Sequence, residues 1–230
     1  MNSSYKICDL NQNKRSFMFR YFTLIFLIAL SFGIFQLSTT KVHMIRHGEK
    51  VIQKGIEDAP LTERGKMQAK TAGNQLKKRE DKPEFLYASP MRRARQTAFL
   101  IQEELKVPLL FDSRLTEKSY YQTKEKYEDG HFKFSKHKNG IKESASDHLK
   151  RLMNFIEEKA TFFNQDIWII AHGGLMARIF EKISKRTKRP LPRHLKLKYA
   201  SEFVFEYNKL TGNFKYLEHY HVPDNEERKI

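Results

Sequence analysis

Apolar residues are distributed along most of the chain in two patterns, as short continuous runs and as positions spaced one helical turn apart. Short runs predict strands at 41–45 (KVHMI), 84–89 (EFLYAS), 107–112 (VPLLFD) and 166–174 (DIWIIAHGG). The last run is apolar throughout and ends in Gly-Gly, which is typical of a central strand in a parallel sheet. We therefore expect at least part of the sheet to be buried on both faces.

Helical spacing fills the intervals between these runs. We expect helices at 61–79, from Pro90 to about Leu105, at 143–163 and at 175–184. Thr62 is suited to cap the first of them, and proline is favoured in a first helical turn such as that of the second. Strands and helices thus alternate, which predicts an α/β fold.

The last part of the chain changes to two alternating apolar and polar runs at 201–207 and 213–220, joined through Lys-Leu-Thr-Gly. They predict an antiparallel addition at the end of the sheet. The whole pattern predicts a three-layer sandwich over residues 41–222, with a mostly parallel central sheet and helices on both faces. Residues 223–230 are left as a C-terminal tail.

Two segments of this domain lack clear periodicity. Residues 118–142 are rich in Lys, Tyr and His, and we interpret them as a long loop or lid. Residues 181–198 are basic and interrupted by prolines, and we interpret them as a connection.

An uncharged apolar run at 21–37 (YFTLIFLIALSFGIFQL) precedes the domain and is about long enough to cross a hydrocarbon core. Basic residues dominate the preceding tail 1–20, so the positive-inside rule places that tail in the cytoplasm and the domain outside it, on the periplasmic side if the protein is bacterial. Two alternatives remain open. One is a cleaved signal peptide, which would leave a secreted or periplasmic protein, and the other is a buried core helix.

Composition adds a strong positive charge: 43 Lys and Arg against 27 Asp and Glu give a formal net charge of +16. This balance favours anionic partners such as nucleic acid, an anionic membrane surface or a phosphorylated substrate, or it reflects only a solvated Lys-rich surface. The single cysteine, Cys8, excludes an intrachain disulfide.

Polar side chains gather where the predicted strands end. The first strand leads into Arg46, His47 and Glu49, the second into Ser89, Arg92, Arg93 and Arg95, the third into Arg114 and Glu117, and the central one into His172. Ligands of open α/β sheets bind at the carboxyl ends of the strands. A site rich in arginine and histidine is therefore expected at this edge, suited to a phosphate group.

Other chemistries fit the sequence less well. His43 and His47 are four residues apart on a strand, roughly 13 Å at the usual rise, which is too far to share one metal ion. His43 is therefore interpreted as a structural residue, and we expect neither a metal nor a cofactor. Cys8 has Lys14 where a cysteine phosphatase needs arginine, and the chain contains no phosphate-binding G-x-x-x-x-G-K-[ST] loop and no G-x-S-x-G elbow. A histidine nucleophile remains.

Four motifs in this order resemble those of the histidine phosphatase superfamily, also called phosphoglycerate mutase-like: RHGE at 46–49, SPMRRARQTA at 89–98, LTE at 115–117 and AHGG at 171–174. The segment PLTERG at 60–65 is similar to the helix start that follows the first motif in that family. The resemblance spans about residues 41–222 and implies the family's α/β fold and its phosphohistidine chemistry.

Carried over position by position, the resemblance implies that His47 is the nucleophile, that Arg46, Arg93 and His172 hold the phosphate oxygens, and that Glu117 donates a proton to the leaving group. Arg93 occupies the arginine place of the Ser-Pro-x-x-Arg-Ala pattern, with Arg95 as its main rival. Neighbouring arginines would also lower the pKa of His47 and keep one ring nitrogen free to attack. Arginines that neutralise the phosphate charge make a metal ion unnecessary.

The first motif departs from the commonest pattern, Arg-His-Gly-Glu-[Ser/Thr]-x-x-Asn, because Lys50 and Gln53 hold its last two named positions. Lys50 is a candidate replacement for the missing phosphate contact, and Glu49 is either a second acid at the site or the partner of an arginine. The interval between Glu117 and His172 is too short for the insertion of the mutase members, so a phosphatase is favoured over a phosphoglycerate mutase-type phosphotransferase.

Substrate choice is expected to depend on the lysines of 118–142 and on the basic stretch 181–198. The expected partner is a phosphorylated anionic substrate: a small molecule, an envelope glycolipid or a phosphoprotein. A membrane would be contacted through residues 21–37, and nucleic acid is not expected as a partner. A catalytically weak or inactive phosphate-site module that docks anionic partners is the alternative from another functional class.

Overall fold

The computed structural model describes residues 20–21, 23–27, 38–136, 143–162, 165–188 and 197–222. The chain divides at residue 39 into an N-terminal unit and a unit that holds the rest of the protein. Within the described part of the chain, no helix is both long and apolar enough to cross a membrane. The apolar segment 21–37 lies for the most part outside the described residues, so the membrane anchor stays a prediction.

A six-stranded sheet organises the second unit, with the strand order β3-β2-β6-β1-β7-β8. The strands are β1 (Thr39–Arg46), β2 (Leu86–Ala88), β3 (Leu109–Phe111), β6 (Ile167–Ala171), β7 (Glu202–Asn208) and β8 (Asn213–Tyr220). β1 pairs with β6, β6 with β2 and β2 with β3, all in parallel. β7 and β8 form an antiparallel pair at one edge, as the alternating runs of the tail predicted.

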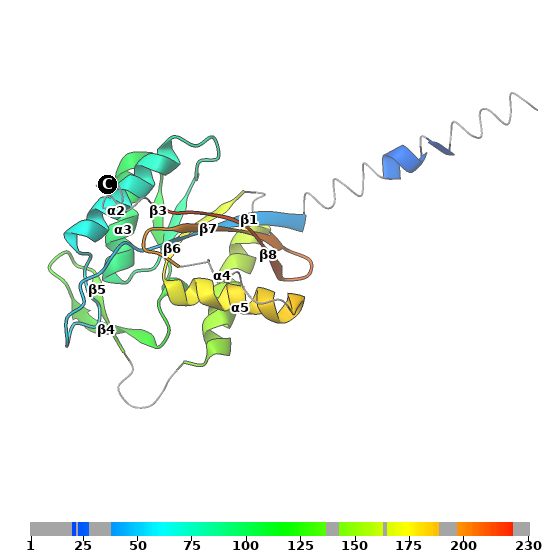
Figure 1. The fold of residues 1–230 in the computed structure, drawn as a ribbon. Coiled ribbons are helices and arrows are strands. Elements are labelled where there is room, and N and C mark those ends of the chain that lie inside the picture. The colour runs from blue at the N-terminus through cyan, green and yellow to red at the C-terminus, as the bar shows by residue number, and fades with distance from the viewer. Residues whose placement is uncertain are drawn as a thin grey trace, which may run out of the picture. The chain divides into compact units, whose positions relative to one another are not determined.

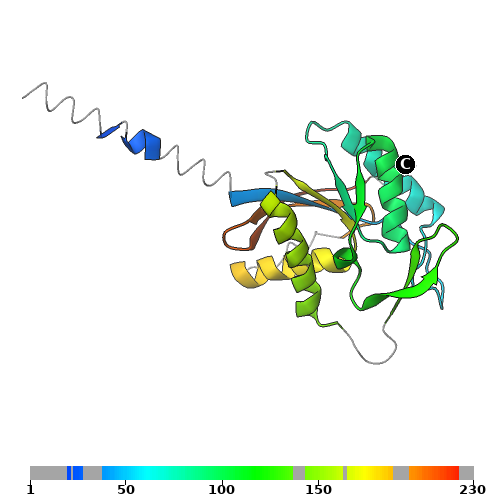
Figure 2. The ribbon, with the colours of Figure 1, turned by 180° about the vertical axis from the view of Figure 1, so that it is seen from behind.

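Helices cover both faces of this sheet (Figures 1 and 2). α2 (Glu63–Lys77) and α3 (Arg92–Leu105) pack against each other on one face. α4 (Ala145–Phe162) and α5 (Gly173–Thr187) lie on the other. The predicted three-layer α/β sandwich is therefore confirmed.

Strand alternation divides the buried residues into two cores, because successive side chains of a strand point to opposite faces. On β6, Ile167 and Ile169 join the core under α4 and α5, while Trp168 and Ile170 join the core under α2 and α3. β1 divides in the same way. β6 and the central part of β1 are buried on both faces, which explains the uninterrupted apolar sequence of β6 and the mostly apolar one of β1, where His43 is the exception.

The prediction of a loop over 118–142 is wrong for most of that segment. β4 (Tyr120–Lys126) and β5 (Phe132–Lys136) form an antiparallel hairpin that makes a second, two-stranded sheet. Gly130 sits in the turn with φ of +80°, a conformation that glycine adopts without strain. The many lysines of this segment interrupt the alternation of apolar and polar residues by which a strand is predicted. Residues 137–142 lie outside the described part.

Several element boundaries also differ from the sequence prediction. The second helix begins at Arg92, two residues after Pro90, where Asp58 Oδ1 accepts the Arg92 N–H at 2.9 Å. α5 begins at Gly173 and continues to Thr187, so the first part of the basic stretch 181–198 is helix rather than connection. Residues 189–196 of that stretch lie outside the described part.

Candidate active site

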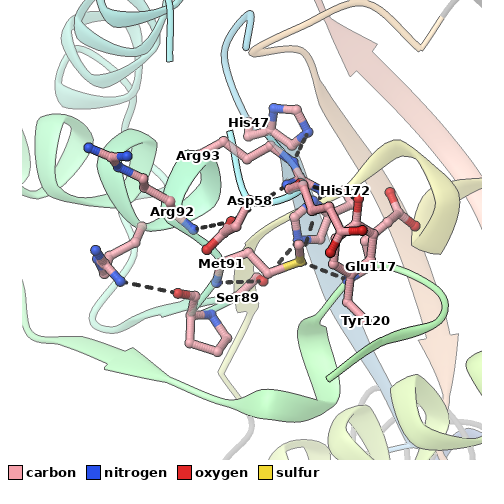
Figure 3. Close-up of polar contacts among 12 residues, drawn as sticks. His47, Asp58, Ser89, Met91, Arg92, Arg93, Glu117, Tyr120 and His172 are labelled. Atoms are coloured by element: carbon pink, nitrogen blue, oxygen red, sulfur yellow. Dashed lines mark hydrogen bonds and ion pairs between the residues drawn. The ribbon is translucent and has the colours of Figure 1, made fainter. Parts of the chain in front are cut away.

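Three neighbouring parallel strands, β1, β6 and β2, end at the same edge of the sheet. The His47 N–H donates to the carbonyl of Ala171 at 3.0 Å, and the Ser89 N–H donates to that of Ile170 at 2.9 Å. His47, Ser89 and His172 thus leave adjacent strands side by side, as Figure 3 shows. The structure brings together the polar residues that the sequence placed at these strand ends.

His47 is almost fully buried, with 3% of its surface exposed. Its Nδ1 lies 2.7 Å from the carbonyl oxygen of Gly48. Because a carbonyl can only accept, this bond requires the ring proton on Nδ1 and leaves Nε2 with a free lone pair. Burial lowers the pKa of His47 well below its ordinary value, and the positive charge of Arg93 lowers it further. Desolvation therefore contributes more than either of the arginines invoked in the sequence argument.

Arg93 is the arginine of the second motif that reaches His47. Its Nε donates to His47 Nε2 at 3.2 Å, and its Nη1 lies 3.8 Å from Asp58 Oδ1 (Figure 3). The rival Arg95 instead donates to Asp129 at 2.9 Å and to the carbonyl of Pro90. The guanidinium of Arg92 lies over the ring of Tyr127. The choice of Arg93 from the Ser-Pro-x-x-Arg-Ala pattern agrees with this geometry.

His172 lies beside His47, with 5.2 Å between the ring centroids. Its Nε2 is 2.8 Å from Ser89 Oγ, so Nδ1 is the nitrogen left for another partner, and no residue of the described part fills that role. Complete burial, together with the charge of Arg93, lowers the pKa of His172 well below its ordinary value. Both histidines are therefore neutral near pH 7.

Arg46 lines the same edge from the last position of β1. Its guanidinium lies 4.1 Å from the ring of Tyr199, and its Nη1 donates to the carbonyl of Leu197. Its Nε is buried and has no hydrogen-bond acceptor among the described residues, and the same holds for Nη1 of Arg93. Such unmet donors are costly unless a ligand accepts from them, which fits a phosphate oxygen.

Glu117 approaches the site from the short 3-10 helix Ser113–Leu115 that follows β3. A Cβ added at Gly174 would overlap the carboxylate of Glu117, so the carboxylate lies directly against the start of α5. Arg151 holds this segment by donating to the carbonyl of Glu117 at 3.3 Å. Arg114, from the same segment, turns away and pairs with Asp112 and Glu158.

Lys50 and Glu49 follow the nucleophile motif and have different surroundings. The carboxylate of Glu49 accepts from the Thr62 hydroxyl at 3.0 Å and lies 3.7 Å from Arg64, at the start of α2. These contacts agree with Glu49 as the partner of an arginine. Partial burial lowers the pKa of Lys50, and the positive charges of Arg93 and Lys136 lower it further.

Glycine is required where the first motif turns toward α2. A Cβ at Gly48 would overlap the carbonyl of Gly65, and one at Gly65 would overlap the carbonyl of Glu49. The Gly48 N–H donates to Thr97 Oγ1 at 3.0 Å, which ties the turn to α3. The two backbones approach this closely only because both positions lack side chains.

Asp58, Tyr120 and Tyr199 also belong to the site and were not found from the sequence. Asp58 is buried beside Arg93, and burial raises the pKa of its carboxyl group. The ring of Tyr120 lies 5.6 Å from the Arg93 guanidinium, and that of Tyr199 lies 5.8 Å from the His47 ring. All three come from segments without periodicity, where the sequence gives no signal of proximity.

Metal ligands were sought among the same residues. In the part of the chain that the structure describes, no group of three or more His, Cys, Asp or Glu side chains is arranged to hold a metal ion. The donors around His47 are guanidinium and imidazole groups, which suit an anion.

Comparison with known proteins agrees with this arrangement. The family profile of the histidine phosphatase superfamily (branch 1) matches residues 42–219. A protein of Hydrogenobacter thermophilus named "Putative phosphoserine phosphatase 2" is 32% identical over 160 residues, which cover 60% of this chain and 76% of that protein. A 2,3-bisphosphoglycerate-dependent phosphoglycerate mutase of Bifidobacterium longum is 36% identical over 90 residues, but the match spans only 37% of its length.

Among solved structures, a mycobacterial glucosyl-3-phosphoglycerate phosphatase superposes with a TM-score of 0.57. The match covers 77% of this chain and 97% of the other at 21% identity, and it shows a shared fold. Because the family profile matches most of the domain, the chain belongs to the histidine phosphatase superfamily and is a phosphatase of the histidine phosphatase type.

Proposed function

We propose that the protein is a metal-independent phosphomonoesterase that works through a phosphohistidine on His47. The observation that carries the proposal is the contact of Arg93 Nε with His47 Nε2, at the atom that must attack phosphorus. The same contact places a positive charge where the phosphate would bind. His172, Arg46 and Glu117 surround that position from three further segments of the chain.

In the first step His47 Nε2 attacks phosphorus, a P–N bond forms and the ester P–O bond breaks. Arg46, Arg93 and His172 donate to the phosphate oxygens, where negative charge is concentrated in the transition state. The leaving alkoxide takes a proton from the Glu117 carboxyl group. The hydrogen bond from Nδ1 to the Gly48 carbonyl holds the ring in the tautomer that can attack.

In the second step water replaces histidine on phosphorus. The Glu117 carboxylate removes a proton from the water, the oxygen attacks phosphorus, and the P–N bond breaks. Inorganic phosphate leaves, Glu117 is again protonated, and His47 Nε2 is again unprotonated. Each group ends the cycle in the state in which it began, so no cofactor is consumed.

The test compares the full-length chain with the variants His47→Ala and His47→Asn on a panel of phosphomonoesters, without added metal or bisphosphoglycerate. We expect the wild type to release phosphate and both variants to lose at least about 10⁴-fold in kcat, because a nucleophile that acts with its partners is lost entirely. Circular dichroism checks that the variants remain folded.

Rapid quenching of a reaction with labelled substrate gives an independent readout. Acid-labile phosphate should be bound to the wild type and absent from both His47 variants. Equal turnover by wild type and variants would refute the mechanism. Turnover that requires bisphosphoglycerate and moves phosphate between positions of one molecule would instead support a mutase.

A further inference from the structure

Three basic residues lie at the end of α5 that is farthest from the candidate active site. The helix begins directly after His172, and the exposed side chains of Lys185, Arg186 and Lys188 follow at its other end. Its 15 residues, at a rise of about 1.5 Å per residue, separate the two ends by about 20 Å. These cations therefore cannot contact a phosphate held at His172.

The turn between β7 and β8 brings an exposed leucine to the same end of the domain. β7 lies beside β1 in the sheet, and the Arg46 N–H at the end of β1 donates to the carbonyl of Ser201, just before β7, at 2.9 Å. β7 therefore runs back along β1, and the turn after it lies near the start of β1 (Figures 1 and 2). Arg186 Nη2 donates to the carbonyl of Phe214 at 3.3 Å, which ties the end of α5 to the strand after this turn. Leu210, in the turn, is 77% exposed.

Together the helix end and the turn form a basic corner, which consists of Lys185, Arg186, Lys188, Lys209 and Leu210. The carboxylate of Glu181, one helical turn before the first of these lysines, pairs with Arg178 at 2.7 Å. Within the described residues, none of the three cations of the helix end has a carboxylate within 4 Å. Basic residues in a last turn stabilise the helix dipole, but that effect does not account for the exposed leucine beside them.

Cations around an exposed apolar side chain suit the surface of an anionic bilayer. Lysine and arginine are attracted to anionic lipids, and an apolar side chain among them can enter the boundary of the hydrocarbon. The chain also enters the domain at this end, because β1 begins at Thr39, two residues after the apolar run 21–37 that the sequence predicts to cross a membrane. If that run spans a bilayer, so short a connection keeps the start of β1 within about 10 Å of its surface. A nucleic acid would bind the cations through its phosphates and leave the leucine without a partner.

We propose that the basic corner docks on an anionic lipid surface and holds the candidate active site on the far side of the domain, away from the bilayer. The contact uses no residue of that site, so it is independent of the phosphatase chemistry. A few cations and one leucine bind a bilayer weakly by themselves, and stable attachment takes a second signal. The predicted membrane segment 21–37 supplies that signal on the same side of the domain.

Quenching by spin-labelled lipids in the full-length chain tests both the contact and the orientation. Cys8→Ser removes the single native cysteine, and a new one is introduced as Thr211→Cys, in the turn, or as Ile52→Cys, at a position that is 87% exposed and five residues after His47. Each cysteine is labelled with an environment-sensitive fluorophore, and the chain is reconstituted into vesicles. We expect strong quenching at Thr211→Cys in phosphatidylglycerol vesicles, weak quenching there in phosphatidylcholine vesicles, and none at Ile52→Cys in either.

Paired substitutions test the role of charge in the same assay. Lys185→Gln combined with Lys188→Gln should lower the ratio of docked to undocked chain about 25-fold, because each cation near an anionic surface contributes about fivefold. Arg186 is kept, since it also holds the strand after the turn. Lys124→Gln combined with Lys126→Gln is the matched control, because it removes two exposed cations from the β4–β5 hairpin, and it should leave the ratio unchanged. Salt at about 1 M should release the wild-type chain.

Several results would overturn lipid docking: equal quenching at Thr211→Cys in the two lipids, equal quenching at Thr211→Cys and Ile52→Cys, or undiminished quenching in the Lys185→Gln, Lys188→Gln chain. A wild-type chain that stays free of phosphatidylglycerol vesicles would also refute it. Binding of DNA or RNA that is lost in the same double variant, without lipid quenching, would assign the corner to nucleic acid instead. None of these readouts depends on phosphatase activity, so the docking and the proposed function are tested separately.

Discussion

Two buried histidines, His43 within β1 and His47 directly after it, have opposite surroundings. His43 stacks on Trp168, its Nδ1 lies 2.7 Å from Glu202, and its Nε2 lies 3.7 Å from Asp166. Burial alone would lower the pKa of His43, but the two carboxylates outweigh it and raise the pKa above its ordinary value. His47, four residues on, has Arg93 as its nearest charge, and its pKa is lowered.

Burial lowers the pKa of both histidines, and the neighbouring charges decide whether that lowering is reinforced or reversed. A histidine between carboxylates keeps its second proton to higher pH than a free imidazole. A histidine beside arginines loses its second proton and offers a lone pair to phosphorus. The Glu202 carboxylate also accepts from Arg79 at 2.7 Å, so His43 and Arg79 share one buried carboxylate.

Arg93→Met breaks the comparison most strongly, because it removes the charge that distinguishes the two histidines. We expect kcat/KM to fall by about 10³-fold, the order of loss for a donor that stabilises transition-state charge. The acid limb of the kcat/KM profile should also move to higher pH, since Arg93 lowers the pKa of His47. Steady-state kinetics across pH measure both effects.

Arg95→Met is the control for that experiment, because Arg95 lies in the same helix and pairs with Asp129. Its activity per folded molecule should stay within about tenfold of wild type, because Arg95 contacts Asp129 and the Pro90 carbonyl and stabilises no charge at the reacting atoms. A larger loss in Arg95→Met than in Arg93→Met would reverse the assignment of the phosphate-binding arginine.

Glu117→Gln sharpens the comparison by leaving His47 intact and removing the acid. We expect kcat for alkyl phosphates to fall by about 10²-fold, because the leaving alkoxide loses its proton donor. In the same variant, p-nitrophenyl phosphate should transfer its phosphate to His47 faster than alkyl phosphates do, because the nitrophenolate leaving group needs no proton. A burst of nitrophenol and an accumulated phosphoenzyme are then expected in stopped-flow measurements.

Glu125→Gln provides a carboxylate-to-amide control on the exposed hairpin and should show neither effect. If alkyl and nitrophenyl phosphates lose the same factor in Glu117→Gln and no phosphoenzyme accumulates, Glu117 does not act as the proton donor.

His43→Gln should change stability and barely change the activity of folded protein. The loss of its buried hydrogen bond should cost about 1–3 kcal/mol of unfolding free energy. Because the pKa of His43 is raised in the folded state, its protonation stabilises the fold. This contribution to the free energy of unfolding is complete below the unfolded-state pKa of about 6.5 and is lost as pH rises through the folded-state pKa. The gap between wild type and variant should therefore be larger near pH 6 than near pH 9, as urea unfolding would show.

The reverse dependence would contradict the raised pKa of His43. His47 contributes with the opposite sign, because its pKa is lowered in the folded state. Below about pH 6.5 the unfolded chain takes up a proton there that the folded chain does not, which reduces stability as pH falls. Comparing each variant with wild type separates the two contributions.

The sequence by itself determined the sandwich fold and most of the site. Continuous apolar runs require strands buried on both faces, and parallel strands that end at one edge must bring their following residues together. His47, Arg46, Arg93 and His172 follow from that rule and from motif spacing. The apolar segment 21–37 remains a sequence prediction, since most of it lies outside the described residues.

Only the tertiary structure decided which charges meet. Asp58 reaches Arg93 from an irregular segment, and Lys136 lies near the ring of Tyr120 because β4 and β5 pair in a register that sets the two residues opposite each other. The motif separates His43 from His47 in the sequence, but the groups that shift their pKa values in opposite directions include Asp166, Glu202 and Arg93, which come from distant segments. Periodicity reports which face a residue occupies on its own element, whereas electrostatics depends on what the other elements bring to that face.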